Sequence, residues 1–109
     1  MSARLAGAAP LSLILLTYQR PLDEVDAAMA RHVAWLELGF DAGVFVAAGR
    51  RDPRSGGVIL CRGTGPEVEA LVATDPFVTE GIATAEIIAF NASFAAPELA
   101  EVLAAVPDG

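Results

Sequence analysis

The sequence of 109 residues predicts one α+β domain. Three observations predict this class: apolar runs of strand length alternate with amphipathic stretches, the elements follow the order β-α-β-β-α-β, and 54% of the residues are hydrophobic. A single cysteine excludes an internal disulfide framework and fits the reducing cytoplasm, where we expect the protein to reside. We therefore expect one domain that is held together by its own hydrophobic core.

The first predicted strand covers residues 11–18, which are rich in Leu and Ile and lie between Pro10 and Pro21. Residues 1–9 before it show no pattern and are predicted to form a flexible tail. The apolar run lacks the small-x-small site of a signal peptide and falls short of the ~20 residues that span a bilayer. The sequence therefore predicts neither secretion nor a membrane partner.

A long helix is predicted next, with Asp23 as its N-cap and its end near Gly43. Apolar residues recur at helical spacing along one stripe, while charged residues lie off it. The stripe consists of Val25, Ala28, Met29, His32, Leu36 and Phe40.

Turn residues separate the remaining elements. These elements are a strand at 44–48, a polar loop at 49–57, a strand at 58–62, a helix at 67–73, a helical turn at 75–81, a strand at 83–90 that can extend to 94, and a C-terminal helix at 97–105. Their order predicts a ferredoxin-like βαββαβ fold, with a four-stranded antiparallel sheet and helices on one face. The domain is placed at residues 10–94 and a C-terminal helical extension at 95–109.

The charge and hydropathy of the chain restrict its partners. The net charge is −7 and the chain contains no Lys, so its field repels phosphate backbones and argues against nucleic acid. The mean hydropathy of +0.51 is high for so small a domain. Since one face of the predicted sheet is left bare and apolar, we expect a homodimer, or a higher oligomer built from it.

One His and one Cys leave no zinc site of the usual nitrogen and sulfur ligands, so no metal or cofactor is predicted. Cys61 lies within a predicted strand, and nothing near it in sequence lowers its pKa, which favours a structural thiol over a nucleophile. Residues 63–65 (Gly-Thr-Gly) lack the third glycine of a dinucleotide-binding loop and are interpreted as a turn.

Three residues are candidates for a functional site. His32 lies on the apolar stripe, where it is either a core residue or an acid–base group that needs a carboxylate to orient its ring. Asp75 is a candidate for that carboxylate, and it is equally suited to be the N-cap before Pro76. Arg50 begins a basic cluster at 50–54, which is either a solvated loop or an anion clamp at the mouth of a pocket.

The pattern of motifs resembles the YciI-like family, also called YCII-related domain proteins. The resemblance rests on His32 followed by Val-Ala-Trp-Leu at 33–36, on Gly-Gly-Val-Ile-Leu at 56–60, on Thr-Asp-Pro-Phe-Val at 74–78, and on a last strand at 86–90. It covers residues 11–94, nearly the whole chain.

The resemblance implies a ferredoxin-like fold of the dimeric α/β-barrel type, in which two sheets pair face to face. It also implies a pocket with a His-Asp pair, which corresponds here to His32 and Asp75. One related enzyme, a dehydrochlorinase for a chlorinated hydroxyquinol, is taken to use such a pair without metal or cofactor. This sequence departs from the family in having Arg50 after Gly49, where the family usually has Pro, and in its residues from Ala95 onward.

Three functions are therefore open at this point. The first is acid–base chemistry, an elimination or isomerisation of a small phenolic or carboxylate compound, with His32 and Asp75 as catalytic residues and Arg50 binding the substrate. The second is binding of a small acidic ligand without catalysis, and the third is a module for assembly. Loss of ligand binding in His32→Ala is expected for the first two and not for the third.

Overall fold

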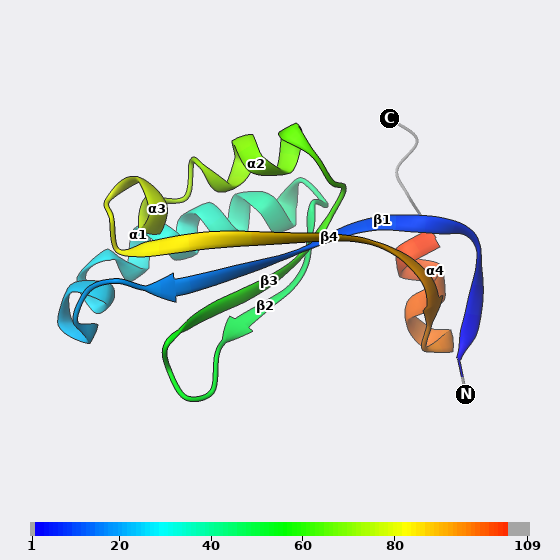
Figure 1. Cartoon of the computed structure of the whole chain (residues 1–109), viewed down its shortest axis with the longest axis horizontal. Helices are drawn as coiled ribbons and strands as arrows, with labels where there is room; N and C mark the ends of the chain where they lie inside the picture. Colours follow the sequence, from blue (N-terminus) through cyan, green and yellow to red (C-terminus); the bar gives the residue numbers. More distant parts are fainter. Residues whose placement is uncertain (1, 105–109) are drawn as a thin grey trace.

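The chain folds into a twisted antiparallel sheet with three helices on one face (Figure 1). The structure is a computed structural model that describes residues 2–104. Its elements are β1 (Ala3–Tyr18), α1 (Leu22–Asp41), β2 (Phe45–Arg50), β3 (Gly56–Arg62), α2 (Pro66–Val72), α3 (Pro76–Thr79), β4 (Ala83–Ala95) and α4 (Pro97–Ala104). The strand order is β2-β3-β1-β4, and every pair is antiparallel. The predicted α+β class and antiparallel sheet are confirmed. Within residues 2–104, no helix is long and apolar enough to cross a membrane.

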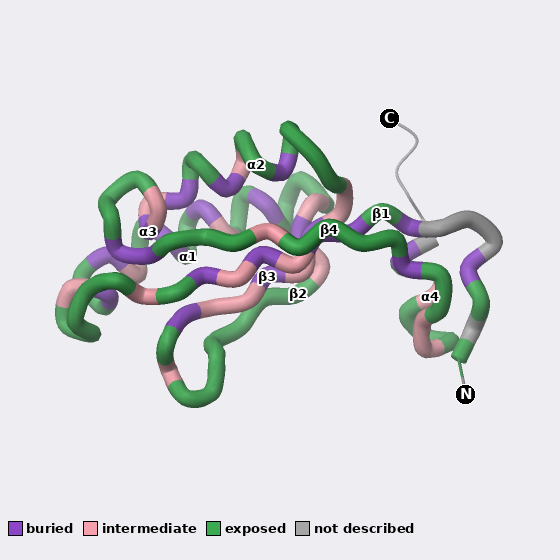
Figure 2. The backbone as a smooth tube through the Cα atoms, viewed as in Figure 1, coloured by how far each residue is buried: buried purple, intermediate pink, exposed green. Residues whose placement is uncertain are grey.

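The main core lies between the sheet and the helices α1, α2 and α3. Alternate residues of β1 face this core, so Ile14 and Leu16 are fully buried while Leu13 and Leu15 on the other face are only half-buried. Helix α2 contributes Val68 and Val72, and helices α1 and α2 bury about every third or fourth residue along their length (Figure 2). This spacing is what coverage of a sheet by one side of a helix requires.

Helix α1 buries a slightly different stripe from the predicted one. Its buried residues are Val25, Ala28, His32, Trp35 and Gly39. Phe40 is exposed, because the helix turns Gly39 toward the sheet, where a Cβ atom would lie only 2.2 Å from the Phe45 ring. The helix also begins earlier than predicted. Pro21 occupies the N-cap position, and Asp23 lies in the first turn, where its charge still favours the helix dipole.

The second face of the sheet is uncovered by α1, α2 and α3, and it is mainly apolar, with the carboxylate of Glu86 opposite Leu15. Leu13 lies opposite both Leu60 and Ile88, and Leu11 lies opposite Phe90, so these side chains share one face. Ile88 and Phe90 are more than 40% exposed. We call this surface the open face; its central residues are Leu13, Leu15, Val58, Leu60, Ile88 and Phe90.

Strands β1 and β4 continue beyond the sheet as a two-stranded arm that carries α4 (Figure 1). The arm comprises residues 3–10 and 91–104, and a register shift between Arg4 and Ala9 bends it. The predicted flexible tail at residues 1–9 is therefore wrong from Ala3 onward. The first strand predicted at 11–18 also omits the pairing that β1 makes with β4 in the arm. The cause is a second hydrophobic cluster, in which Leu5 and Leu103 are buried. Of the predicted tail and C-terminal extension, residues 1 and 105–109 lie outside the described part of the chain.

Candidate functional site

His32 and Asp75 meet in the interior between α1 and α3. The Nδ1 atom of His32 lies 2.8 Å from Oδ1 of Asp75, although the two residues are 43 positions apart. The side chain of His32 is 9% exposed, and that of Asp75 is fully buried. The structure thus joins two candidates that the sequence pattern alone left separate.

Asp75 is placed by the local sequence that starts α3. Its Oδ1 atom accepts a hydrogen bond from the backbone N–H of Phe77 at 3.0 Å, and Pro76 occupies the first helical position. Both alternatives for Asp75 therefore hold at once, because a single oxygen caps the helix and contacts His32. The other oxygen, Oδ2, is buried and has no hydrogen-bond partner among the described residues.

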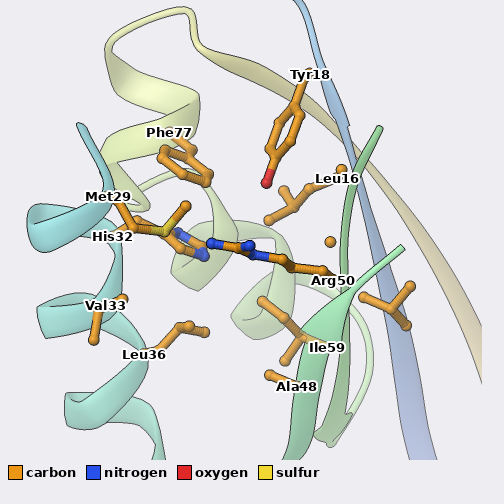
Figure 3. A pocket seen from close by; sticks show the side chains of 14 residues that line it. Leu16, Tyr18, Met29, His32, Val33, Leu36, Ala48, Arg50, Ile59 and Phe77 are labelled. Carbon is orange, nitrogen blue, oxygen red and sulfur yellow. The ribbon is translucent and has the colours of Figure 1, made fainter. Parts of the chain in front are cut away.

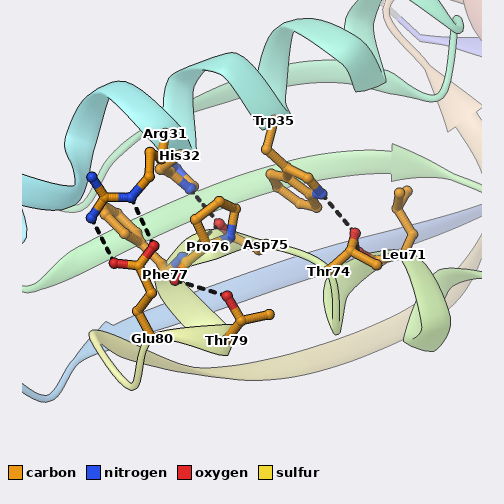
Figure 4. A network of polar contacts seen from close by, with 10 residues as sticks. All are labelled: Arg31, His32, Trp35, Leu71, Thr74, Asp75, Pro76, Phe77, Thr79 and Glu80. Carbon is orange, nitrogen blue, oxygen red and sulfur yellow. Dashed lines mark hydrogen bonds and ion pairs between the residues drawn. The ribbon is translucent and has the colours of Figure 1, made fainter.

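Two aromatic side chains hold the His32 ring. The Phe77 ring stacks on it with 4.0 Å between centroids and 2° between planes, and Trp35 lies at 5.9 Å and 26°. The Trp35 indole N–H donates to Thr74 Oγ1 at 2.9 Å, and that hydroxyl donates to the carbonyl of Leu71 at 2.6 Å (Figure 4). The imidazole is therefore fixed by packing as well as by its hydrogen bond.

This arrangement assigns different tasks to the two ring nitrogens. When Asp75 is ionised it is only an acceptor, so Nδ1 of His32 carries the proton that is donated to it. In the neutral ring the Nε2 atom then holds a lone pair, and this is the form of histidine that acts as a general base. His32 also lines a pocket, so this lone pair belongs to a residue within reach of a ligand.

The pocket is a cavity of about 140 Å³ between α1 and the strands β1, β2 and β3 (Figure 3). An engineered protein cavity of roughly 150 Å³ is large enough to hold benzene, so this one has the size of a single six-membered ring. Its wall is mainly apolar, and its polar side chains are Tyr18, His32 and Arg50. A small number of polar groups in an apolar cavity is typical of sites for small molecules.

Arg50 is the last residue of β2 and extends from that strand toward His32 (Figure 3). The strand ends two residues later than predicted, so Arg50 belongs to the sheet rather than to the loop. No carboxylate in the described part of the chain forms an ion pair with it. Its guanidinium is accordingly available to an anion in the pocket.

The other two arginines of the basic cluster have partners. Arg51 donates to Thr17 Oγ1 at 3.2 Å, and Arg54 forms an ion pair with Asp26 of α1 at 2.5 Å. The hydrogen bond with Asp26 is the main cause that raises the pKa of Arg54. The cluster therefore divides into one arginine at the pocket and two that hold the loop against the body.

Sequence reasoning missed three residues of the site, namely Tyr18, Trp35 and Phe77. Tyr18 and Phe77 line the pocket, and Trp35 packs on the His32 ring. Trp35 lies three positions after His32 and thus on the same side of the helix, which is a signal that could have included it. Tyr18 closes a strand, and no local pattern marks it.

Comparison with known proteins supports the resemblance drawn from the motifs. The family model of the YCII-related domain matches residues 11–91. The chain belongs to the YCII-related domain family. No curated protein matches the sequence.

Among solved structures, the chain is similar to 5-chloro-2-hydroxyhydroquinone dehydrochlorinase from Burkholderia phenoliruptrix, determined in complex with 2,5-dihydroxybenzoquinone. The TM-score is 0.60 at 23% sequence identity, over 72% of this chain and 90% of that one. At this identity the likeness shows a shared fold. The family match ends at residue 91, so most of the arm, including all of α4, lies outside it.

Proposed function

We propose that this YCII-related domain protein binds a small acidic or phenolic compound and transfers a proton to or from it. In this proposal His32 is the acid–base residue, Asp75 orients it, and Arg50 binds the negative charge of the ligand. The observation that carries the proposal is the 2.8 Å contact between His32 and Asp75 beside a pocket of ring size. The proposed chemistry uses neither metal nor cofactor.

The proposed reaction is an elimination or an isomerisation. The Nε2 atom of His32 takes a proton from a hydroxyl group or an activated carbon of the substrate, and the electron pair of that bond moves into the ring. In the elimination of chloride from a chlorinated, hydroxylated ring, the imidazolium returns this proton to the ring carbon that bears chlorine. A second hydroxyl group then loses its proton to solvent, the C–Cl bond breaks with its electron pair leaving as chloride, and a quinone remains. Arg50 stabilises the oxyanion that forms on the way. In an isomerisation the imidazolium returns its proton to a different atom of the same ring.

The structural neighbour supports the choice of ligand class. Its name states that it removes chloride from a hydroxylated aromatic ring, and it was determined with a dihydroxybenzoquinone bound. We extend to this chain the class of planar, oxygen-substituted six-membered rings. The cavity of about 140 Å³ and its single unpaired arginine fit such a compound.

We also propose that the protein is a homodimer in which two open faces pack together. The exposed Ile88 and Phe90 and the half-buried Leu13 and Leu60 form a contiguous apolar surface. Exposed patches of this kind mark interfaces in soluble proteins, and a stable dimer needs on the order of 1,500 Å² of buried surface in total.

The experiment is a binding and turnover comparison. Binding of 2,5-dihydroxybenzoquinone is measured by its visible absorbance for wild type, Arg50→Ala and Arg51→Ala, and chloride release is measured with 5-chloro-2-hydroxyhydroquinone. We expect Arg50→Ala to weaken binding by about tenfold or more, and Arg51→Ala to have little effect because its side chain contacts Thr17.

His32→Gln separates catalysis from binding. For an enzyme, we expect it to lower turnover by about a hundredfold or more while most of the binding remains. Binding without turnover in wild type would favour a binding module over an enzyme. Absence of binding, or equal effects of Arg50→Ala and Arg51→Ala, would contradict the proposed ligand site.

A further inference from the structure

Tyr18 contributes a polar group to the pocket that the proposed reaction does not use. It is the last residue of β1, and its hydroxyl points into the cavity (Figure 3). The ring packs edge-on against Phe77, with 5.9 Å between centroids and 89° between planes. Its backbone N–H donates to the carbonyl of Ser55 at 2.9 Å, which fixes this end of β1 to the loop between β2 and β3.

The same loop carries Arg54, which connects Tyr18 to helix α1. Arg54 Nη2 lies 2.5 Å from Asp26 Oδ1, and the Arg54 side chain is only 26% exposed. The Tyr18 hydroxyl is close enough to this guanidinium to add a smaller contribution to the rise in the pKa of Arg54. The ion pair between Arg54 and Asp26 and the hydrogen bond from Tyr18 to the neighbouring Ser55 thus hold the loop and the end of β1 together beside the pocket.

The chemistry of these groups decides the direction of the hydrogen bonds. A guanidinium has only donors, so toward Arg54 the Tyr18 oxygen can act only as an acceptor. The single proton of the phenol is then left for another acceptor.

We infer that Tyr18 donates a hydrogen bond to a second oxygen of the ligand, and that Arg54, anchored by Asp26, is its positioning residue. This inference rests on the proposed function and narrows it. The ligand would carry one anionic oxygen for Arg50 and another oxygen that accepts from Tyr18. A hydroxylated quinone carries such oxygens at separate positions of its ring, whereas both oxygens of benzoate belong to the one carboxylate that Arg50 binds.

The test compares two probes and two variants. 2,5-dihydroxybenzoquinone has oxygens at four ring positions, whereas benzoate has one carboxylate and no oxygen elsewhere on its ring. We expect Tyr18→Phe to weaken binding of the quinone by about tenfold and to change binding of benzoate by less than about twofold. Phenylalanine keeps the ring and its contact with Phe77, and a thermal melt by circular dichroism verifies that the fold is retained.

Arg54 is tested through its dependence on Tyr18. We expect Arg54→Ala to weaken quinone binding by about threefold in wild type and to have no further effect in Tyr18→Phe, since residues of one network couple rather than add. Arg51→Ala is the matched control, because this arginine lies in the same segment and contacts Thr17 instead.

Several results would overturn the inference. Unchanged quinone binding in Tyr18→Phe, or equal losses for both probes, would show that Tyr18 only packs against the ligand. An Arg54→Ala effect that persists in Tyr18→Phe would remove its positioning role. Quinone binding that depends on Arg50 but not on Tyr18 would overturn this inference alone, and a wild type that binds neither probe would overturn the proposed function as well.

Discussion

Replacing Asp75 separates the two contacts that one carboxylate oxygen makes. Oδ1 accepts from the Phe77 N–H at 3.0 Å and from the His32 ring at 2.8 Å, in a side chain with no exposed surface. Three substitutions divide these contacts: Asp75→Ala removes both, Asp75→Ser keeps an oxygen for the helix cap but is too short to reach His32, and Asp75→Asn keeps an acceptor for both.

The magnitudes follow from the two contacts. Loss of a helix N-cap costs about 1 kcal/mol, and loss of a hydrogen bond to a charged group costs about 1.5 to 3 kcal/mol. We therefore expect Asp75→Ala to lower the free energy of unfolding by about 2.5 to 4 kcal/mol, and Asp75→Ser by about 1.5 to 3 kcal/mol. Asp75→Asn should cost about 1 kcal/mol, because its NH₂ group would replace the buried Oδ2, which has no partner among the described residues.

Urea denaturation at neutral pH measures these differences, and thermal unfolding gives a second value. For a domain of this size the Ala variant should melt roughly 10 °C or more below wild type. The order Ala, Ser, Asn from least to most stable is the main expectation. Stability of Asp75→Ser equal to wild type would show that the contact with His32 contributes nothing to the fold, and Asp75→Asn as unstable as Asp75→Ala would refute the partition into two contacts.

Three further predictions concern other parts of the molecule. The hydrogen bond with Arg31 lowers the pKa of Glu80, so this pair stabilises the folded state at pH values above the ordinary pKa of a glutamate and loses this effect as the pH falls. The difference in melting temperature between wild type and Glu80→Gln should therefore close between about pH 5 and pH 3. A difference that stays constant over this range would contradict the ion pair. Burial raises the pKa of the Cys61 thiol, which has no exposed surface, so a maleimide should label it only in urea, and rapid labelling in buffer would contradict its place in the core. Light scattering at low micromolar concentration should give the mass of a dimer for wild type and of a monomer for Phe90→Asp, whereas a monomeric wild type would contradict pairing through the open face.

The sequence predicts the order of elements well where a local physical signal exists. Proline and glycine mark the end of β1 and both ends of α1 to within a few residues, and Asp75 followed by Pro76 correctly marks the start of α3. The tail at residues 1–9 was predicted wrongly because its pairing partner, the end of β4, lies more than 80 positions away. Register between such distant segments depends on the hydrophobic cluster that the arm forms with α4.

In the site, too, the sequence predicts features that depend on neighbouring residues and misses contacts between residues far apart in the chain. The position of His32 on the buried side of α1 follows from helical spacing, but its contact with Asp75 needs the packing of α1 against α3 or the resemblance to a known family. Arg50 is singled out from the sequence because it follows Gly49 at the end of a predicted strand, and the structure adds that Arg54 pairs with Asp26 instead. Tyr18 was missed because a tyrosine at the end of a strand is common, and only the fold turns its hydroxyl toward a cavity.

The arm has a practical consequence for work with this protein. Ala3 and α4 both lie at the end of the molecule that points away from the pocket, which is built from the opposite end of β1 and from α1 (Figure 1). An affinity tag or a fluorescent protein joined to either end of the described chain would therefore start far from the pocket mouth. Fusions at both ends also bring their attached partners close together, so a donor and an acceptor fluorophore placed there would report on unfolding of the arm while leaving the pocket accessible to ligand.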